Sequence, residues 1–238
     1  PRLGTLKLYH LLYPELKQVN VGRDMFNTIL KVNGLLVKPL KQYRTTTNSN
    51  HFFKKYKDLI AGMSISRPEQ VWVSDITYIS HRHRHYYLSL VTDAYSKRIM
   101  GYSVDISMNV EFVLDALKMA IKNREYKMKL IHHSDRGSQY CCKEYQSILR
   151  KFGIITSMTE NSDPYSNAIA ERVNGILKQE FLLEGRDCSF SELKVIIKHS
   201  IDAYNNLRPH LSCSLLTPSK MHKQRLLKRK KYNVKLFQ

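Results

Sequence analysis

The hydrophobic positions in the middle of the chain fall into short runs that are rich in β-branched and aromatic residues. Turn-prone residues separate three such runs, which are Val71–Ile79, Tyr86–Thr92 and Lys97–Val104. Runs of this length and composition favour β-strands. The simplest arrangement of three consecutive runs with short connections is an antiparallel sheet, and we predict one here.

After the third run the spacing of hydrophobic residues becomes helical. In Val110–Lys122 the side chains of Val113, Leu114, Leu117 and Ile121 fall on one face of a helix. Strand-like and helical stretches then alternate. The remaining predicted elements are strands at Lys129–His132 and Ile154–Ser157 and helices at Ser138–Lys151, Ala168–Leu183 and Ser191–Tyr204. The order β-β-β-α-β-α-β-α indicates an α/β fold, with a mixed sheet and helices on its faces.

The beginning of the chain has a different pattern. Leucines from Leu3 to Leu12 keep rough helical spacing before Pro14, and a second amphipathic stretch, Met25–Val32, ends at Gly34. Two short helices with a turn between them suggest a helix-turn-helix-like DNA-binding unit. A basic helical pair that only packs on its neighbour is the alternative.

These patterns divide the chain into four parts. We predict a helix-turn-helix-like unit at 1–48, a linker at 49–66, a catalytic core at 67–185, and a C-terminal helix with a basic tail at 186–238. No apolar run approaches the length that a membrane span requires, so we expect no membrane partner and a cytoplasmic protein. The four cysteines contain no C-x-x-C pair, which argues against a zinc ribbon.

Charge narrows the class of partner. The 238 residues include 39 Lys and Arg against 20 Asp and Glu, a formal net charge of +19. A globular protein this basic is expected to bind a polyanion, and nucleic acid is the common case. The densest block, Lys228-Arg229-Lys230-Lys231, is either an electrostatic arm for the phosphate backbone or a solvated chain end.

Three acids occupy positions suited to catalysis. Asp75 lies inside the first predicted strand, where a lone buried carboxylate would be costly. Asp135 follows the strand at Lys129–His132, and ligands gather at the carboxyl ends of strands. Glu171 lies near the start of a helix, and Lys178 follows it two turns later on the same face.

If the three carboxylates converge, their hard oxygen ligands favour Mg²⁺ or Mn²⁺ over zinc. Two such ions form the usual arrangement for in-line phosphodiester chemistry, with Lys178 beside them on a phosphate. Three acids in unrelated salt bridges are the alternative, because Lys and Arg are abundant here.

The residues around the acids form extended motifs. They are Trp72-x-x-Asp75-x-Thr77-Tyr78, His132-x-Ser134-Asp135-Arg136-Gly137-Ser138-Gln139-Tyr140, Pro164-Tyr165-x-Asn167-Ala168-x-x-Glu171, Lys178-x-Glu180, Tyr204-Asn205-x-x-Arg208-Pro209-His210 and Thr217-Pro218. Together they resemble the transposases of bacterial insertion sequences of the IS-three family, over about residues 1–222.

This resemblance implies a ribonuclease-H-like fold shared with retroviral integrases. It also implies a catalytic and metal-binding triad of Asp75, Asp135 and Glu171, followed by the basic residue Lys178. The family's full transposase usually joins such a chain to an upstream helix-turn-helix and zipper segment. We therefore expect a metal-dependent DNA transposase of the bacterial cytoplasm and nucleoid, which acts on transposon ends and target DNA as a homo-oligomer, with that segment as a candidate partner.

Further residues are expected to contact DNA because of their position in these motifs or in the basic tail. They are Lys178, Arg136, Asn167, Tyr204, Arg208, Lys228, Arg229, Lys230 and Lys231. Two other functions stay open from the sequence: a catalytically silent DNA-binding protein, and a nuclease of the same fold that cuts without joining.

Overall fold

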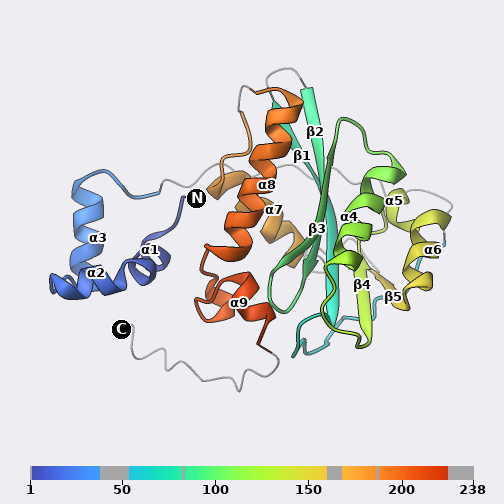
Figure 1. Ribbon diagram of the computed structural model, residues 1–238, viewed down its shortest axis with the longest axis horizontal. Coiled ribbons are helices and arrows are strands. Elements are labelled where there is room, and N and C mark those ends of the chain that lie inside the picture. The colour runs from blue at the N-terminus through green and yellow to red at the C-terminus, as the bar shows by residue number, and fades with distance from the viewer. Residues whose placement is uncertain (1, 38–53, 82–83, 160–167, 186–187, 225–238) are drawn as a thin grey trace.

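The computed structural model describes residues 2–37, 54–81, 84–159, 168–185 and 188–224, and centres on one five-stranded sheet. The strand order is β3-β2-β1-β4-β5 (Figure 1). The strands are β1 (Val71–His81), β2 (Arg84–Asp93), β3 (Ile99–Asp105), β4 (Leu130–Ser134) and β5 (Ile154–Met158). Strand β1 pairs antiparallel with β2 and parallel with β4, which confirms the predicted mixed sheet.

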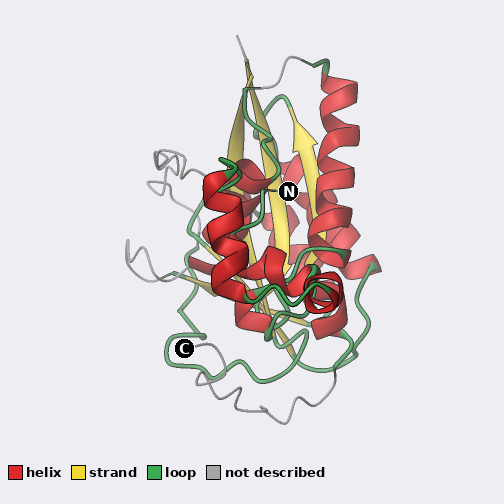
Figure 2. Ribbon diagram, turned by 90° about the vertical axis from the view of Figure 1, so that its left-hand side faces the viewer, coloured by secondary structure: helices red, strands yellow, loops and turns green. Residues whose placement is uncertain are grey.

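Helices cover both faces of this sheet (Figure 2). On one face, Trp72 and Met100 pack against α4 (Val110–Lys122), α5 (Ser138–Cys141) and α6 (Lys143–Lys151). On the other face, Leu88 and Leu90 pack against α7 (Ala168–Glu180) and α8 (Phe190–Asn206). Alternate residues of β1 and β2 therefore point into two separate cores, as strand geometry requires.

Two predicted helices have different bounds in the structure. The predicted helix Ser138–Lys151 is two helices, α5 and α6, because Cys142 is extended (φ −64°, ψ 155°) and its Sγ accepts a hydrogen bond from the Tyr145 N–H. Helix α7 ends at Glu180 instead of Leu183, and Leu182 takes a left-handed conformation with φ 54°.

The N-terminal unit has three short helices where the sequence predicted two. They are α1 (Thr5–Leu11), α2 (Tyr13–Gln18) and α3 (Arg23–Val32), and they lie beside the core in Figure 1. Pro14 begins a helix here instead of ending one, since the first turn of a helix needs no proline N–H. Phe26 and Leu30 form the small buried part of this unit.

Residues 54–66, within the predicted linker, run along the open edge of the sheet. The Met158 N–H of β5 donates to the Lys57 carbonyl at 3.3 Å, and the Leu59 N–H donates to the Ser157 hydroxyl at 2.9 Å. An exposed strand edge is prone to pair with other chains, and this segment covers it.

The C-terminal part is anchored by a buried polar cluster. Helix α9 (Pro218–His222), which follows a short 3₁₀ turn at Leu211–Cys213, places the His222 ring between Glu69 and Asp93. Burial opposes the charged ring, but hydrogen bonds that the ring donates to these two acids raise the pKa of His222 above its ordinary value. The cluster ties the end of the described chain to the strand ends of the core.

Among the residues that the structure describes, no helix is long and apolar enough to cross a membrane.

Gly101 is required by the close approach of β3 to α4. A Cβ atom there would lie 2.1 Å from the Ala116 carbonyl oxygen and 2.6 Å from the Ala120 nitrogen. We expect Gly101→Ala to lower the free energy of unfolding by about 3 kcal/mol or more, measured by urea denaturation, because backbone atoms cannot move aside cheaply. Gly175→Ala is the matched control: space is open there in α7, so the same substitution should stabilise by roughly 0.5–1 kcal/mol. Equal effects of the two substitutions would contradict this account.

Candidate functional site

The pairing of β1 with β4 brings two of the predicted catalytic acids together. Ser74 lies opposite Ser134 in the parallel register, and Asp75 and Asp135 are the residues that follow them in the chain. In a parallel pair, the residues that follow two paired residues lie side by side. The two acids, 60 positions apart in the sequence, are therefore neighbours at one place on the sheet.

A tight turn holds the backbone of Asp135. The Gly137 N–H donates to Asp135 Oδ1 at 3.0 Å, and the Ser134 hydroxyl donates to the Asp135 carbonyl at 2.9 Å. An added Cβ on Gly137 would lie 3.0 Å from that same Oδ1. The glycine of this motif thus lets the backbone approach the carboxylate closely.

Helix α7 brings the third acid to the same face of the sheet. Glu171 lies in its first turn, and Asn174 and Lys178 follow at helical spacing on the side that packs against β1. The Asn174 amide donates to Asp75 Oδ2 at 2.8 Å. This contact, which the sequence analysis missed, links the helix directly to the acid of β1.

The three carboxylates are electrostatically coupled. Burial, then the charge of Asp135, raises the pKa of Asp75 to about 7, and Glu171 adds to the rise while the Asn174 hydrogen bond opposes it. Burial and Asp135 also raise the pKa of Glu171. Each acid makes ionisation of its neighbours less favourable, so the three carboxylates together carry excess negative charge.

The donor set of this site suits a hard divalent cation. Three carboxylates that repel one another supply the oxygen ligands that Mg²⁺ and Mn²⁺ prefer. Within the described residues, however, no three Asp, Glu, His or Cys side chains already lie close enough to hold one ion. The chemistry of the residues fits a metal, and their side chains are near one another without being gathered around a point.

Two adjacent histidines, His132 and His133, lie in β4 shortly before Asp135. His132 Nε2 lies 2.8 Å from the Ser74 hydroxyl and 2.9 Å from the Tyr145 hydroxyl, and burial lowers the pKa of His132 to about 3. His133 Nδ1 lies 2.9 Å from the Ser157 hydroxyl. Both rings are buried and pack within the fold, so neither is placed to touch a substrate.

Lys178 lies near the acids but is covered. Its side chain is 5% exposed, its Nζ lies 3.3 Å from Glu184 Oε1, and it stands over the Tyr78 ring at 4.4 Å. Burial lowers the pKa of Lys178, against the opposing effects of Glu184 and Asp75. In this state the ammonium is held by Glu184 instead of facing solvent.

Arg136 follows Asp135 and lies in the same region as a second basic segment of the chain. Lys55 and Arg136 both act on the Cys141 thiol, whose pKa burial and the Asp135 charge raise to about 11. Lys54, Lys55 and Lys57 of the edge-covering segment are exposed. Positive charge from two parts of the chain thus reaches the surroundings of Cys141.

The expectation that Tyr204 and Arg208 contact DNA is wrong for this structure. Arg208 is 1% exposed and binds Glu180 with two bonds, Nε to Oε2 at 2.7 Å and Nη2 to Oε1 at 2.6 Å. Tyr204 is fully buried, and its hydroxyl donates to the Lys97 carbonyl at 2.9 Å. Both side chains join the end of α8 to the rest of the fold, with Lys7 as a second partner of Glu180 at 3.1 Å.

Five predicted DNA contacts lie outside the described residues. They are Asn167, Lys228, Arg229, Lys230 and Lys231.

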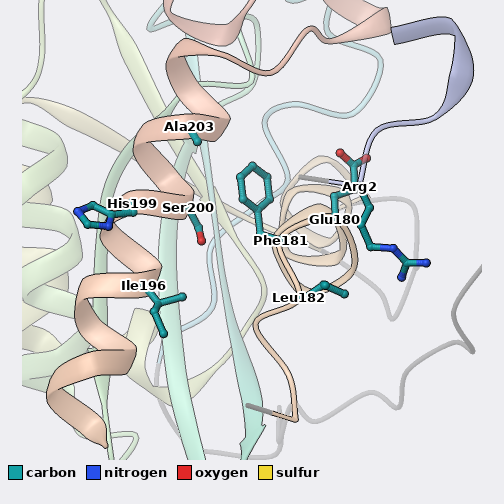
Figure 3. Close-up of a pocket in the computed structure, with 8 residues that line it drawn as sticks. All are labelled: Arg2, Glu180, Phe181, Leu182, Ile196, His199, Ser200 and Ala203. Atoms are coloured by element: carbon teal, nitrogen blue, oxygen red, sulfur yellow. The ribbon is translucent and has the colours of Figure 1, made fainter. Parts of the chain in front are cut away.

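A cleft of about 540 Å³ lies away from the three acids, between the start of the chain and α8. Figure 3 shows Ile196, His199, Ser200 and Ala203 on α8, with Phe181 and Glu180 across from them. None of the three acids lines it, so the cleft is separate from the candidate site.

Comparison with protein families identifies the core. The integrase core domain matches residues 65–164, and a second integrase core domain pattern matches residues 152–218. The 31 kDa protein of insertion element IS600 from Shigella sonnei is 35% identical over 201 residues, which are 84% of this chain and 74% of that protein. The transposase of insertion sequence IS629, also from Shigella sonnei, is 32% identical over 86% of this chain and 68% of its own length. Transposase InsF of IS3fB from Escherichia coli is 30% identical, with coverages of 83% and 69%.

Solved structures confirm the predicted ribonuclease-H-like fold. The catalytic core domain of HTLV-2 integrase in complex with magnesium superposes with a TM-score of 0.53 at 22% identity, covering 66% of this chain and 97% of that one. A chain of the simian T-cell lymphotropic virus intasome in complex with PP2A regulatory subunit B56 gamma superposes with a TM-score of 0.59 at 18% identity, covering 94% of this chain and 76% of that one.

The raised pKa of Asp75 predicts a pH-dependent stability. A carboxyl in an unfolded chain titrates near about pH 4, whereas Asp75 in the folded chain has a pKa of about 7. Below about pH 4 the ionisation of Asp75 therefore does not lower the free energy of unfolding. The destabilisation grows between about pH 4 and about pH 7 and reaches its full size above about pH 7. We expect Asp75→Asn to raise the melting temperature of the metal-free chain by several degrees at about pH 8 and to lose this gain towards about pH 4. Thermal unfolding across this pH range measures the gain.

Asp115→Asn on the exposed face of α4 is the matched control and should show no such trend. A gain in melting temperature from Asp75→Asn that does not vary with pH would contradict the charge coupling.

Proposed function

Because this chain belongs to the insertion-sequence transposases with an integrase core domain, and so is a DDE-type enzyme of DNA transposition and integration, we propose that Asp75, Asp135 and Glu171 are its catalytic and metal-binding residues. The observation that carries this proposal is the register of β1 and β4, which makes Asp75 and Asp135 neighbours, with Glu171 coupled to them from α7. Coupling among three carboxylates at the carboxyl end of a parallel strand pair is what a cation-binding site in such a sheet needs.

We infer that the cofactor is Mg²⁺ or Mn²⁺ and that two ions bind. When bound, such a pair supplies activation of the attacking oxygen and charge stabilisation of the leaving 3′ oxygen in phosphodiester chemistry. The three carboxylates would hold the cations, and Asp75 would give up the proton that it carries in part at neutral pH, since its pKa is about 7. Hydrolysis at a transposon end exposes a 3′-hydroxyl, and joining uses that hydroxyl on a second phosphodiester.

Double-stranded DNA at transposon ends and target would approach along the basic side of the site. Arg136, which follows Asp135 in the chain, and the exposed Lys54, Lys55 and Lys57 would contact phosphates, as would Asn167 and the tail residues 228–231. The N-terminal helical unit would bind DNA next to the core. We further propose that the active form is a homo-oligomer on DNA, together with an upstream helix-turn-helix and zipper segment, in the bacterial cytoplasm and nucleoid.

Lys178 would contact a phosphate only after leaving Glu184. The present pair is a carboxylate on the ammonium at 3.3 Å, and a DNA phosphodiester is the same kind of partner, an oxyanion with one negative charge. The loop after α7 is fixed on β1 by a hydrogen bond from the Gly185 N–H to the Ser80 carbonyl at 3.1 Å, which keeps Glu184 in place. As DNA binds, a phosphate would then replace Glu184 as the partner of the Lys178 ammonium.

The triad is tested by cleavage and joining of oligonucleotides that carry the element's terminal repeats. Asp135→Asn should lower both steps by at least about 100-fold, because even outer partners of a metal ligand change activity roughly 10- to 100-fold. DNA binding, measured by gel shift without metal, should be retained. The control Asp115→Asn makes the same chemical change on the exposed surface of α4 and should leave both steps intact.

Two outcomes would contradict the proposal. Joined product from Asp135→Asn at the native rate would remove Asp135 from the reaction. Cleavage by the native chain with no joining under any condition that supports end binding would indicate a nuclease.

If a DNA phosphate replaces Glu184 on Lys178, substitutions at these two residues should change DNA affinity in opposite directions. Glu184→Gln should strengthen binding to transposon-end DNA a few-fold, since the competing carboxylate is lost, whereas Lys178→Met should weaken binding and reduce the salt slope by about 1. Glu111→Gln adds the same charge on α4 and is the matched control. In the Lys178→Met background the Glu184 substitution should give no gain beyond that control; an undiminished gain there would show that Glu184 does not act through Lys178.

A further inference from the structure

We propose that Asn174 is a positioning residue for Asp75, one that orients this carboxylate for the cation. The inference rests on the proposed role of Asp75 as a metal ligand. Asn174 lies on α7 between Glu171 and Lys178, and it is 4% exposed. Its amide Nδ2 donates to Asp75 Oδ2 at 2.8 Å.

The contact fixes the direction of the carboxylate. A carboxylate on a strand can rotate about its terminal bond, and this rotation must stop before both oxygens have defined places. The Asn174 donor holds Oδ2 on the side of α7, so the position of Oδ1 follows.

The other half of the Asn174 amide is not used by the fold. Its Oδ1 is buried and has no hydrogen-bond partner among the described residues. Leaving a buried acceptor unpaired destabilises the folded state, and a leucine of similar size would avoid this loss. A residue whose donor serves one carboxylate at a cost to stability is typical of a site arranged for function.

Asn205 shows the structural use of the same side chain. It lies on α8, where its Oδ1 accepts from the Ile99 N–H at 2.9 Å and its Nδ2 donates to the Ile99 carbonyl at 3.0 Å. Both halves of this amide are paired with the backbone of β3. Asn205 therefore serves as a matched control: a half-buried helical asparagine that contacts no acid of the site.

The experiment is calorimetric titration of Mn²⁺ alone into the full chain, with the melting temperature of each variant measured in parallel. Asn174→Leu should lower Mn²⁺ affinity roughly 10-fold with an unchanged or higher melting temperature, as expected of a residue that orients a metal ligand. Asn174→Ala should give the same loss of affinity, and it provides the measurement should the leucine variant not fold. Asn205→Ala should show the opposite pattern, a lower melting temperature and native affinity.

The variant Asp75→Asn distinguishes a failure of the inference about Asn174 from a failure of the proposed metal site. If Asp75→Asn loses Mn²⁺ binding while both Asn174 variants keep native affinity, the inference is overturned and the proposed site stands. If Asp75→Asn itself binds Mn²⁺ as the native chain does, the proposed site is wrong and the inference is overturned with it. As a second readout, excess Mn²⁺ should restore strand joining in Asn174→Leu and not in Asp75→Asn, since only the latter has lost a ligand.

Discussion

Repulsion among three carboxylates is the interaction on which the rest of this site depends. The parallel register of β1 and β4 puts Asp75 beside Asp135, and α7 adds Glu171, so negative charge collects where the sheet is partly closed to water. The fold offsets this charge only in part, through the Asn174 amide and the more distant Lys178. A site with excess negative charge has a built-in affinity for cations, and DNA chemistry requires them.

Helix α7 is therefore the central element of the site. Asn174 and Lys178 contact Asp75 and Tyr78 of β1, and the more exposed Glu171 acts on Asp75 through its charge. Its far end is fixed by Glu180, which binds Arg208 and Lys7 at once. The Tyr204 to His210 motif, which resembles a family signature, thus stabilises the helix that carries Glu171.

The sequence predicted the sheet well because strands depend on local patterns, such as the short β-branched run Val71–Ile79. The extended motifs around Asp75 and Asp135 also singled out two acids that the parallel register makes neighbours, and their catalytic role stays a prediction. The sequence could not separate buried from exposed polar residues in the C-terminal segment, so Tyr204 and Arg208 were misassigned to DNA. Asn174 was missed for a similar reason: its partner is 99 positions away, and no spacing rule marks such a contact. The break at Cys142 also escaped prediction, because a single extended residue leaves helical periodicity intact on both sides.

The central claim is that Asp75, Asp135 and Glu171 hold divalent cations together. Anomalous diffraction from crystals of the full chain soaked in Mn²⁺ tests it most directly, because the signal locates the ion without reference to activity. The account predicts anomalous peaks bounded by oxygens of all three carboxylates, with Glu171 drawn closer to Asp75 and Asp135 than it lies without metal. Strong peaks elsewhere with none among these acids, at Mn²⁺ concentrations that support strand joining, would contradict it.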